Sequence, residues 1–133
     1  MSAEIIYDSP YATLWYHPES KIVHHKFHKS IYDQDYRDFF LLGTQTLKEH
    51  SAQKWLSDDQ TNTLSGKEEM IWGKEIWFPK TVEAGWKYWA IVQPKNVIGQ
   101  INMRKLVKEF SAQGIETRFF ISIDEAMKWL ESL

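Results

Sequence analysis

Cysteine is absent from this chain of 133 residues. The absence excludes disulfides, a thiolate nucleophile and zinc sites with cysteine ligands, and it fits a reducing compartment. Glycine is scarce, because only six glycines are scattered along the sequence and none of them builds a phosphate-binding loop. The Gly-x-Ser-x-Gly and His-Glu-x-x-His motifs of hydrolases and metalloproteases are missing as well. We therefore expect a protein that is not an enzyme.

Neither sign of charge is in large excess. Sixteen Lys and Arg oppose eighteen Asp and Glu, and the net charge is −2. Phosphate backbones are bound by a surplus of positive charge, so we expect no nucleic-acid binding. No run approaches the roughly 18 apolar residues that span a membrane, and the first residues lack the basic and apolar regions of a signal peptide. We expect a soluble cytoplasmic protein, with one domain over residues 1–133 because no linker divides the sequence.

Aromatic residues are abundant, at 15% of the sequence with seven Trp, six Tyr and seven Phe. Aromatic side chains bury large areas and dominate both cores and interfaces. One interpretation is a core rich in Trp. The alternative is a pocket for a small apolar ligand, or a surface for self-association, lined by Trp72, Trp77 and Trp89. Over residues 86–92, strand alternation places Trp86 and Tyr88 on one face and Trp89 on the other.

The N-terminal half contains a hairpin followed by a helix. Two β-type runs, 12–17 and 21–28, flank a turn at 18–20, and a short strand over 4–7 precedes them. In this hairpin we expect His17 to face Ile22 and Trp15 to face His24. Ser30 and Asp33 then resemble a capping box, before a helical apolar face. The members of that face are Tyr36, Phe39, Phe40, Gly43 and Leu47.

The C-terminal half alternates strands and helices. Strands are predicted over 54–56, 86–92 and 117–121, and a weak helix over 68–76 is interrupted by Pro79. We expect Asn102 to begin the next helix, in preference to Asn96, and Ser122 with Glu125 to cap the last one. Strands joined by helical crossovers lie parallel. The predicted fold class is therefore α/β, with a mixed sheet that contains an N-terminal hairpin and is covered by helices.

This element order, together with two segments of sequence, resembles the SpoIIAA-like, STAS-type family of small bacterial proteins. The segments are WKYWAIVQP at 86–94 and FFISIDEAMKWL at 119–130. The resemblance covers nearly the whole chain. It implies a mixed four- to five-stranded sheet with packed helices, and a non-enzymatic role in regulation or protein binding. In the anti-sigma-factor antagonists of that fold, a partner kinase phosphorylates a Ser or Thr after the middle strand and so switches partner binding. The corresponding stretch here, 58–66, lacks their Asp-Ser-Ser/Thr-Gly arrangement, so Thr61, Thr63 and Ser65 are candidates by position.

Asp58 and Asp59 follow the predicted strand at 54–56, where open α/β sheets place ligands. One interpretation is a loop with Asx turns and a helix cap. Another is a loop that binds a ligand or partner. A phosphate on a nearby hydroxyl would add about −1.5 to −2 charges beside the two carboxylates and would be repelled by them.

Four histidines lie in or near the hairpin, at positions 17, 24, 25 and 28. Consecutive strand residues point to opposite faces, so His24 and His25 cannot share one zinc ion, which needs three or four converging ligands. We expect neither a metal nor a cofactor. The sequence favours a non-enzymatic regulatory or protein-interaction module that binds a protein partner or forms a homodimer. The alternatives are a binder of an apolar ligand, as distant likeness to lipid-binding Sec14-type domains suggests, and a small enzyme using Asp58 and Asp59.

Overall fold

The sheet has six strands in sequence order. The structure is a computed structural model that describes residues 3–61, 66–111 and 114–133, without the side chains of residues 110 and 111. The strands are β1 (Glu4–Asp8), β2 (Ala12–His17), β3 (Ile22–Phe27), β4 (Lys54–Asp58), β5 (Tyr88–Val92) and β6 (Glu116–Phe120). β1, β2 and β3 pair antiparallel, and β3 to β6 pair parallel. The α/β class and the mixed sheet are confirmed, whereas the predicted count of four to five strands was too low.

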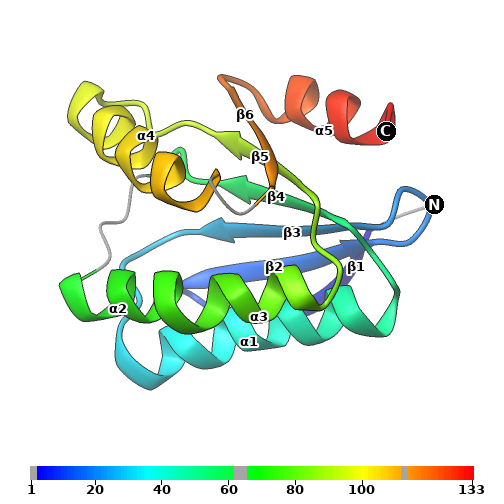
Figure 1. Cartoon of the computed structure of the whole chain (residues 1–133), viewed down its shortest axis with the longest axis horizontal. Helices are drawn as coiled ribbons and strands as arrows, with labels where there is room; N and C mark the ends of the chain where they lie inside the picture. Colours follow the sequence, from blue (N-terminus) through cyan, green and yellow to red (C-terminus); the bar gives the residue numbers. More distant parts are fainter. Residues whose placement is uncertain (1–2, 62–65, 112–113) are drawn as a thin grey trace.

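The strand order decides which face each helix covers. Each right-handed crossover from β3 to β6 adds its new strand on the same side of the strand before it. Such crossovers place their helices on the same face of the sheet. These helices are α1 (Asp33–Glu49), α2 (Lys67–Trp72), η1 (Gly73–Trp77), α3 (Phe78–Glu83) and α4 (Val97–Ser111). The last helix, α5 (Ile123–Glu131), covers the opposite face, as Figure 1 shows for α5 relative to α1 and α3. In the described part of the chain, no helix has the length and apolar character to cross a membrane.

Most of the tryptophans belong to the core beneath the crossover helices. Trp55, Trp77, Trp86 and Trp89 are at most 5% exposed and pack ring against ring. The predicted shared face of Trp86 and Tyr88 is wrong. β5 begins at Tyr88, so strand alternation does not extend back to Trp86, which packs on Trp89. Tyr88 instead contacts Trp129 on the α5 face.

The structure corrects two of the predicted helix starts. α1 has Tyr32 at its N-cap with no side-chain cap, so the Ser30 capping box is wrong; Asp33 instead turns into the helix at φ 54, a left-handed value that Asp tolerates. Asn96, not Asn102, caps α4, because its Oδ1 accepts a hydrogen bond of 2.6 Å from the Gly99 N–H. The Ser122 cap is confirmed by its 3.2 Å hydrogen bond from the Glu125 N–H.

Pro79 does not interrupt the helical segment after β4. Residues 67–83 run through α2, η1 and α3 without a break, and the middle stretch is a π-helical turn. A proline crowds the carbonyl four residues before it. For Pro79 that residue is Glu75, which lies inside the wider π turn. The segment therefore continues past the proline, against the prediction.

Candidate functional site

Three parallel strands end at one edge of the sheet. Lys26, Asp58 and Val92 stand in register at the carboxyl ends of β3, β4 and β5. Open α/β sheets bind ligands at this edge. The polar groups of the β3–α1 and β4–α2 connections meet here and form the candidate site.

Asp58 is almost completely buried, at 2% exposure. Its Oδ1 accepts hydrogen bonds from the Gln60 backbone N–H at 3.2 Å and from Gln60 Nε2 at 3.0 Å. Its Oδ2 lies 3.9 Å from Lys26 Nζ. The first of these bonds is an Asx turn, which holds the start of the β4–α2 connection.

Asp59 pairs with a different residue from Asp58, and this residue lies on the other face of the sheet. Its Oδ1 lies 3.6 Å from Nε2 of His25, whose side chain is buried beneath α1. His25 and Lys26 are consecutive strand residues and point to opposite faces. Asp58 and Asp59 therefore do not converge on one point, as an acid and base acting on the same substrate atoms must.

The other predicted site residues are dispersed. Thr61 is exposed, and Thr63 and Ser65 lie outside the described residues. Trp77 and Trp89 belong to the core, and Trp89 Nε1 donates a hydrogen bond of 2.8 Å to Ser57 Oγ. Trp72 packs at the border of that core, with Arg37 5.9 Å from its ring centre. These three tryptophans act as packing residues in the structure.

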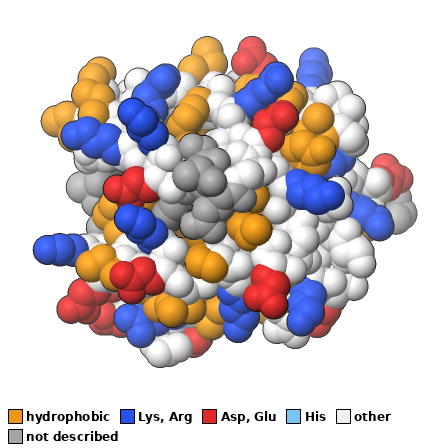
Figure 2. Space-filling view, viewed as in Figure 1, with side chains coloured by type: hydrophobic (Ala, Val, Ile, Leu, Met, Phe, Trp, Pro, Cys, Tyr) orange, Lys and Arg blue, Asp and Glu red, His pale blue; other side chains and the backbone are white. Residues whose placement is uncertain are grey.

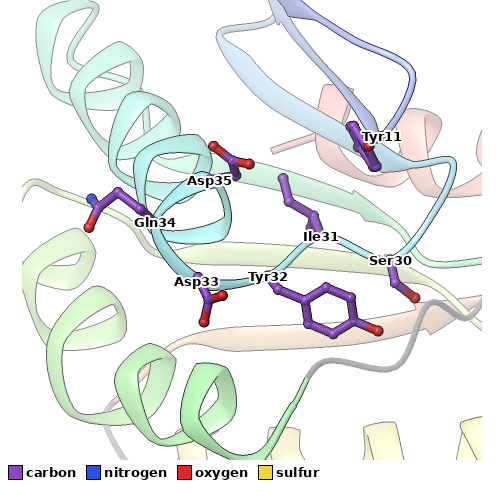
Figure 3. A pocket seen from close by; sticks show the side chains of 7 residues that line it. All are labelled: Tyr11, Ser30, Ile31, Tyr32, Asp33, Gln34 and Asp35. Atoms are coloured by element: carbon purple, nitrogen blue, oxygen red, sulfur yellow. The ribbon is translucent and has the colours of Figure 1, made fainter.

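A pocket of about 330 Å³ lies at the start of α1. Figure 3 shows that its walls come from the β1–β2 turn and the β3–α1 connection. The lining residues are Tyr11, Ser30, Ile31, Tyr32, Asp33, Gln34 and Asp35. The sequence did not predict this pocket, because Tyr11 is far in sequence from the other lining residues. The folded hairpin brings them together, and the His28 N–H donates a hydrogen bond of 2.8 Å to the Tyr11 carbonyl.

His17 and His24 form a pair on the α5 face of the sheet. His17 Nε2 and His24 Nδ1 lie 3.1 Å apart, and the Trp15 ring lies against His24 at 4.5 Å between centres. The pKa of His24 is lowered to about 3, mainly by burial and to a smaller extent by the charges of His17, His25 and Lys26. Burial also lowers the pKa of His17, although Glu131 opposes it. The hairpin register predicted for these residues, His17 with Ile22 and Trp15 with His24, is confirmed.

The first turns of α4 carry exposed aliphatic side chains. Val97, Ile98 and Ile101 are 68%, 72% and 48% exposed, and we call these three residues the α4 patch. Further along the helix, Met103, Leu106 and Val107 pack against the core. Hydrophobic and basic side chains lie close together at the upper left of Figure 2, where α4 lies in the same view.

Comparisons with known proteins identify no relative. No protein-family model matches the chain, and no curated protein or solved structure is significantly similar to it. The function must therefore be argued from the geometry.

Proposed function

We propose that this chain is a non-enzymatic regulatory or protein-interaction module of the STAS/SpoIIAA-like type, which binds its partner through the α4 patch. The α/β class and the mixed sheet agree with the resemblance, although the sheet has six strands where the resemblance implies four or five. The observation that carries the proposal is the exposure of Val97, Ile98 and Ile101, three branched aliphatic residues on neighbouring turns.

These side chains have no partner that keeps them from water, since more than half of Val97 and Ile98 is accessible. Burying an aliphatic side chain of this size fully is worth about 1.5–3 kcal/mol. A protein surface that covers the α4 patch gains much of this free energy, and contiguous exposed apolar surface marks protein-binding sites. The simplest partner is a second copy of the chain, because most soluble oligomers are symmetric dimers of one subunit.

Sedimentation velocity over a concentration series tests the proposal. We expect the wild type to form a dimer and Ile98→Glu to be a monomer, because a buried carboxylate at the interface is costly. Ile5→Glu is the matched control. Ile5 is 63% exposed on β1, the strand at the sheet edge opposite to β6, and the variant should remain a dimer. A dimer that survives Ile98→Glu would contradict the proposal.

A second candidate function is the binding of a small ligand, favoured by the pocket at the start of α1. Its lining offers hydroxyl, amide and carboxylate groups beside two tyrosine rings. Such a ligand would be polar, unlike the apolar ligand that the sequence suggested for a pocket lined by tryptophan. Tyr32→Ala, at a residue 51% exposed, should abolish retention of that ligand in native mass spectrometry without unfolding the protein.

A further inference from the structure

We propose that β6 is a docking edge for a second copy of this chain, and that the two β6 strands pair antiparallel and join two sheets into one. β6 is the last strand of the sheet, and Figure 1 shows it beyond β5. Among the described residues, no strand pairs with its outer side. The inference rests on the proposed function, because it takes a second copy as the partner, and it adds the contacts that join the two copies.

The backbone of β6 has free hydrogen-bonding groups at this edge. The Glu116 N–H donates a hydrogen bond of 3.0 Å to the Lys87 carbonyl, so the backbone groups of Glu116 face β5. Successive residues of a strand direct these groups alternately to one side and to the other. The N–H and C=O groups of Thr117 and Phe119 therefore point away from β5, where a further strand can bond to them.

The opposite edge of the sheet is protected against such pairing, whereas β6 is not. The register of β1 shifts between Ile5 and Tyr7, as at a β-bulge, and bulges keep edge strands from pairing with other chains. β6 pairs with β5 in regular register over all five residues and contains neither proline nor lysine. Its Phe119 and Phe120 side chains are only half-buried. A regular, partly apolar edge strand of this kind is a template for another strand.

The charges of β6 are complementary to those of a second β6. Two copies related by a two-fold axis pair the same strand antiparallel. With the axis at Thr117, the outward backbone groups of this residue bond to those of its symmetry mate, and Glu116 of each copy lies opposite Arg118 of the other. The Cα atoms of such flanking pairs are only about 4.5 Å apart, and opposite charges there stabilise a sheet. β1 has no such match, because its charged residues, Glu4 and Asp8, are both acidic.

Both charged side chains are available for this pairing. Glu116 and Arg118 are exposed, and the Arg118 guanidinium lies 5.0 Å from the centre of the Trp129 ring, on the face that α5 covers. Strand alternation places Glu116 on the same face as Arg118. An axis at Arg118 itself would bring two guanidinium groups opposite each other, so the charges favour the register centred on Thr117.

The edge of β6 lies beside the helix that carries the α4 patch. α4 packs against β6, and the Arg104 guanidinium lies 5.2 Å from the centre of the Phe119 ring. A two-fold axis perpendicular to the sheet keeps each helix on its own face, so the α4 helices of both copies lie on the same face of the joined sheet. One dimer can therefore use the β6 edge and the α4 patch together.

Charge reversals test the pairing by sedimentation velocity and native mass spectrometry. Glu116→Arg and Arg118→Glu each place like charges opposite each other twice, so each should raise the dimer dissociation constant about tenfold or more. An equimolar mixture of the two variants should form a heterodimer, because a basic strand then faces an acidic one. The double variant Glu116→Arg/Arg118→Glu should dimerise like the wild type. Glu4→Arg, at an exposed residue of β1, is the matched control and should leave the dissociation constant unchanged.

A proline substitution tests the backbone contacts. Thr117→Pro removes an N–H that points away from β5, and an edge strand tolerates proline at such a position. The variant should be a monomer with the circular dichroism spectrum of the wild type.

A wild type that stays monomeric, single charge reversals that dimerise like the wild type, or a mixture without heterodimer would each overturn the inference. The α4 patch is tested separately. If the charge reversals dissociate the dimer and Ile98→Glu does not, the pairing of β6 stands and the proposed patch is wrong. If only Ile98→Glu dissociates it, the patch stands and the pairing of β6 is wrong.

Discussion

Trp55 Nε1 donates a hydrogen bond of 2.9 Å to His25 Nδ1 inside the core. The indole N–H can only donate, so Nδ1 of His25 must be the acceptor. The proton of the neutral imidazole therefore lies on Nε2, which points to Asp59 Oδ1 at 3.6 Å. One core tryptophan thus sets the tautomer of a histidine at the candidate site.

Trp55→Phe removes this donor. The variant leaves Nδ1 of His25 buried without a partner, which costs about 1–3 kcal/mol of the free energy of unfolding, in addition to the volume lost. Urea unfolding measures this cost. A double-mutant cycle with His25→Phe should show a coupling of about 0.5–3 kcal/mol. Additive effects of the two substitutions would contradict the assigned hydrogen bond.

The stability should fall in mild acid because of His24. Its pKa is about 3 in the folded protein, lowered mainly by burial, against about 6.5 in the unfolded chain. Between these two values the unfolded state binds the extra proton, so the free energy of unfolding decreases as the pH falls, by at most about 1.4 kcal/mol per pH unit. Above pH 6.5 this contribution is constant.

Urea unfolding of the wild type and His24→Phe at a series of pH values measures this effect. The Phe ring preserves the contact with Trp15 and removes the titration, so the variant should have a shallower dependence on pH below 6.5. An NMR titration that gives His24 an ordinary pKa would contradict the account.

Two glycine substitutions in helices should act in opposite directions. A Cβ at Gly43 would collide with the Trp55 ring, so Gly43→Ala should destabilise the protein by about 1–3 kcal/mol through overpacking. At Gly73 the nearest atom, Tyr36 Oη, is 3.9 Å away. Gly73→Ala should therefore stabilise by about 0.5–1 kcal/mol, as helix propensity predicts. Thermal unfolding of both variants distinguishes packing from propensity, and equal shifts would contradict this explanation.

The end of α1 offers a stabilising substitution. The Ala52 N–H donates to the Leu47 carbonyl at 2.9 Å and the Ser51 N–H to the Lys48 carbonyl at 3.2 Å, which is the Schellman pattern. Ser51 has φ 51, where glycine is favoured. Ser51→Gly should raise the stability by about 0.5–1 kcal/mol, while Ser51→Ala should not. An unfolding midpoint that falls for Ser51→Gly would refute this assignment.

The sequence predicts features that depend on local patterns. The turn at 18–20 and the alternation around it gave the register of His17 with Ile22, and the Ser122 cap was found from its spacing to Glu125. The start of α4 was missed because apolar periodicity reports burial, and the first turns of α4 are exposed. These exposed first turns contain the α4 patch, so the part of α4 that the sequence failed to predict is the proposed binding surface.

Features that depend on distant contacts could not be predicted. Asp33 and Glu69 meet only because α1 and α2 begin at the same edge of the sheet. The separation of Asp58 from Asp59 has the same origin, since Lys26 and His25 of the neighbouring strand pair with one carboxylate each. Neither arrangement can be predicted from the spacing of these residues in the sequence.

Native mass spectrometry of the purified protein tests the central claim most directly, because it reports the subunit count and any retained ligand together. The proposed interaction module predicts a dimer without a bound small molecule, which becomes a monomer in Ile98→Glu and stays a dimer in Ile5→Glu. A monomer that retains a small-molecule adduct would contradict the proposal and direct attention to the pocket at the start of α1.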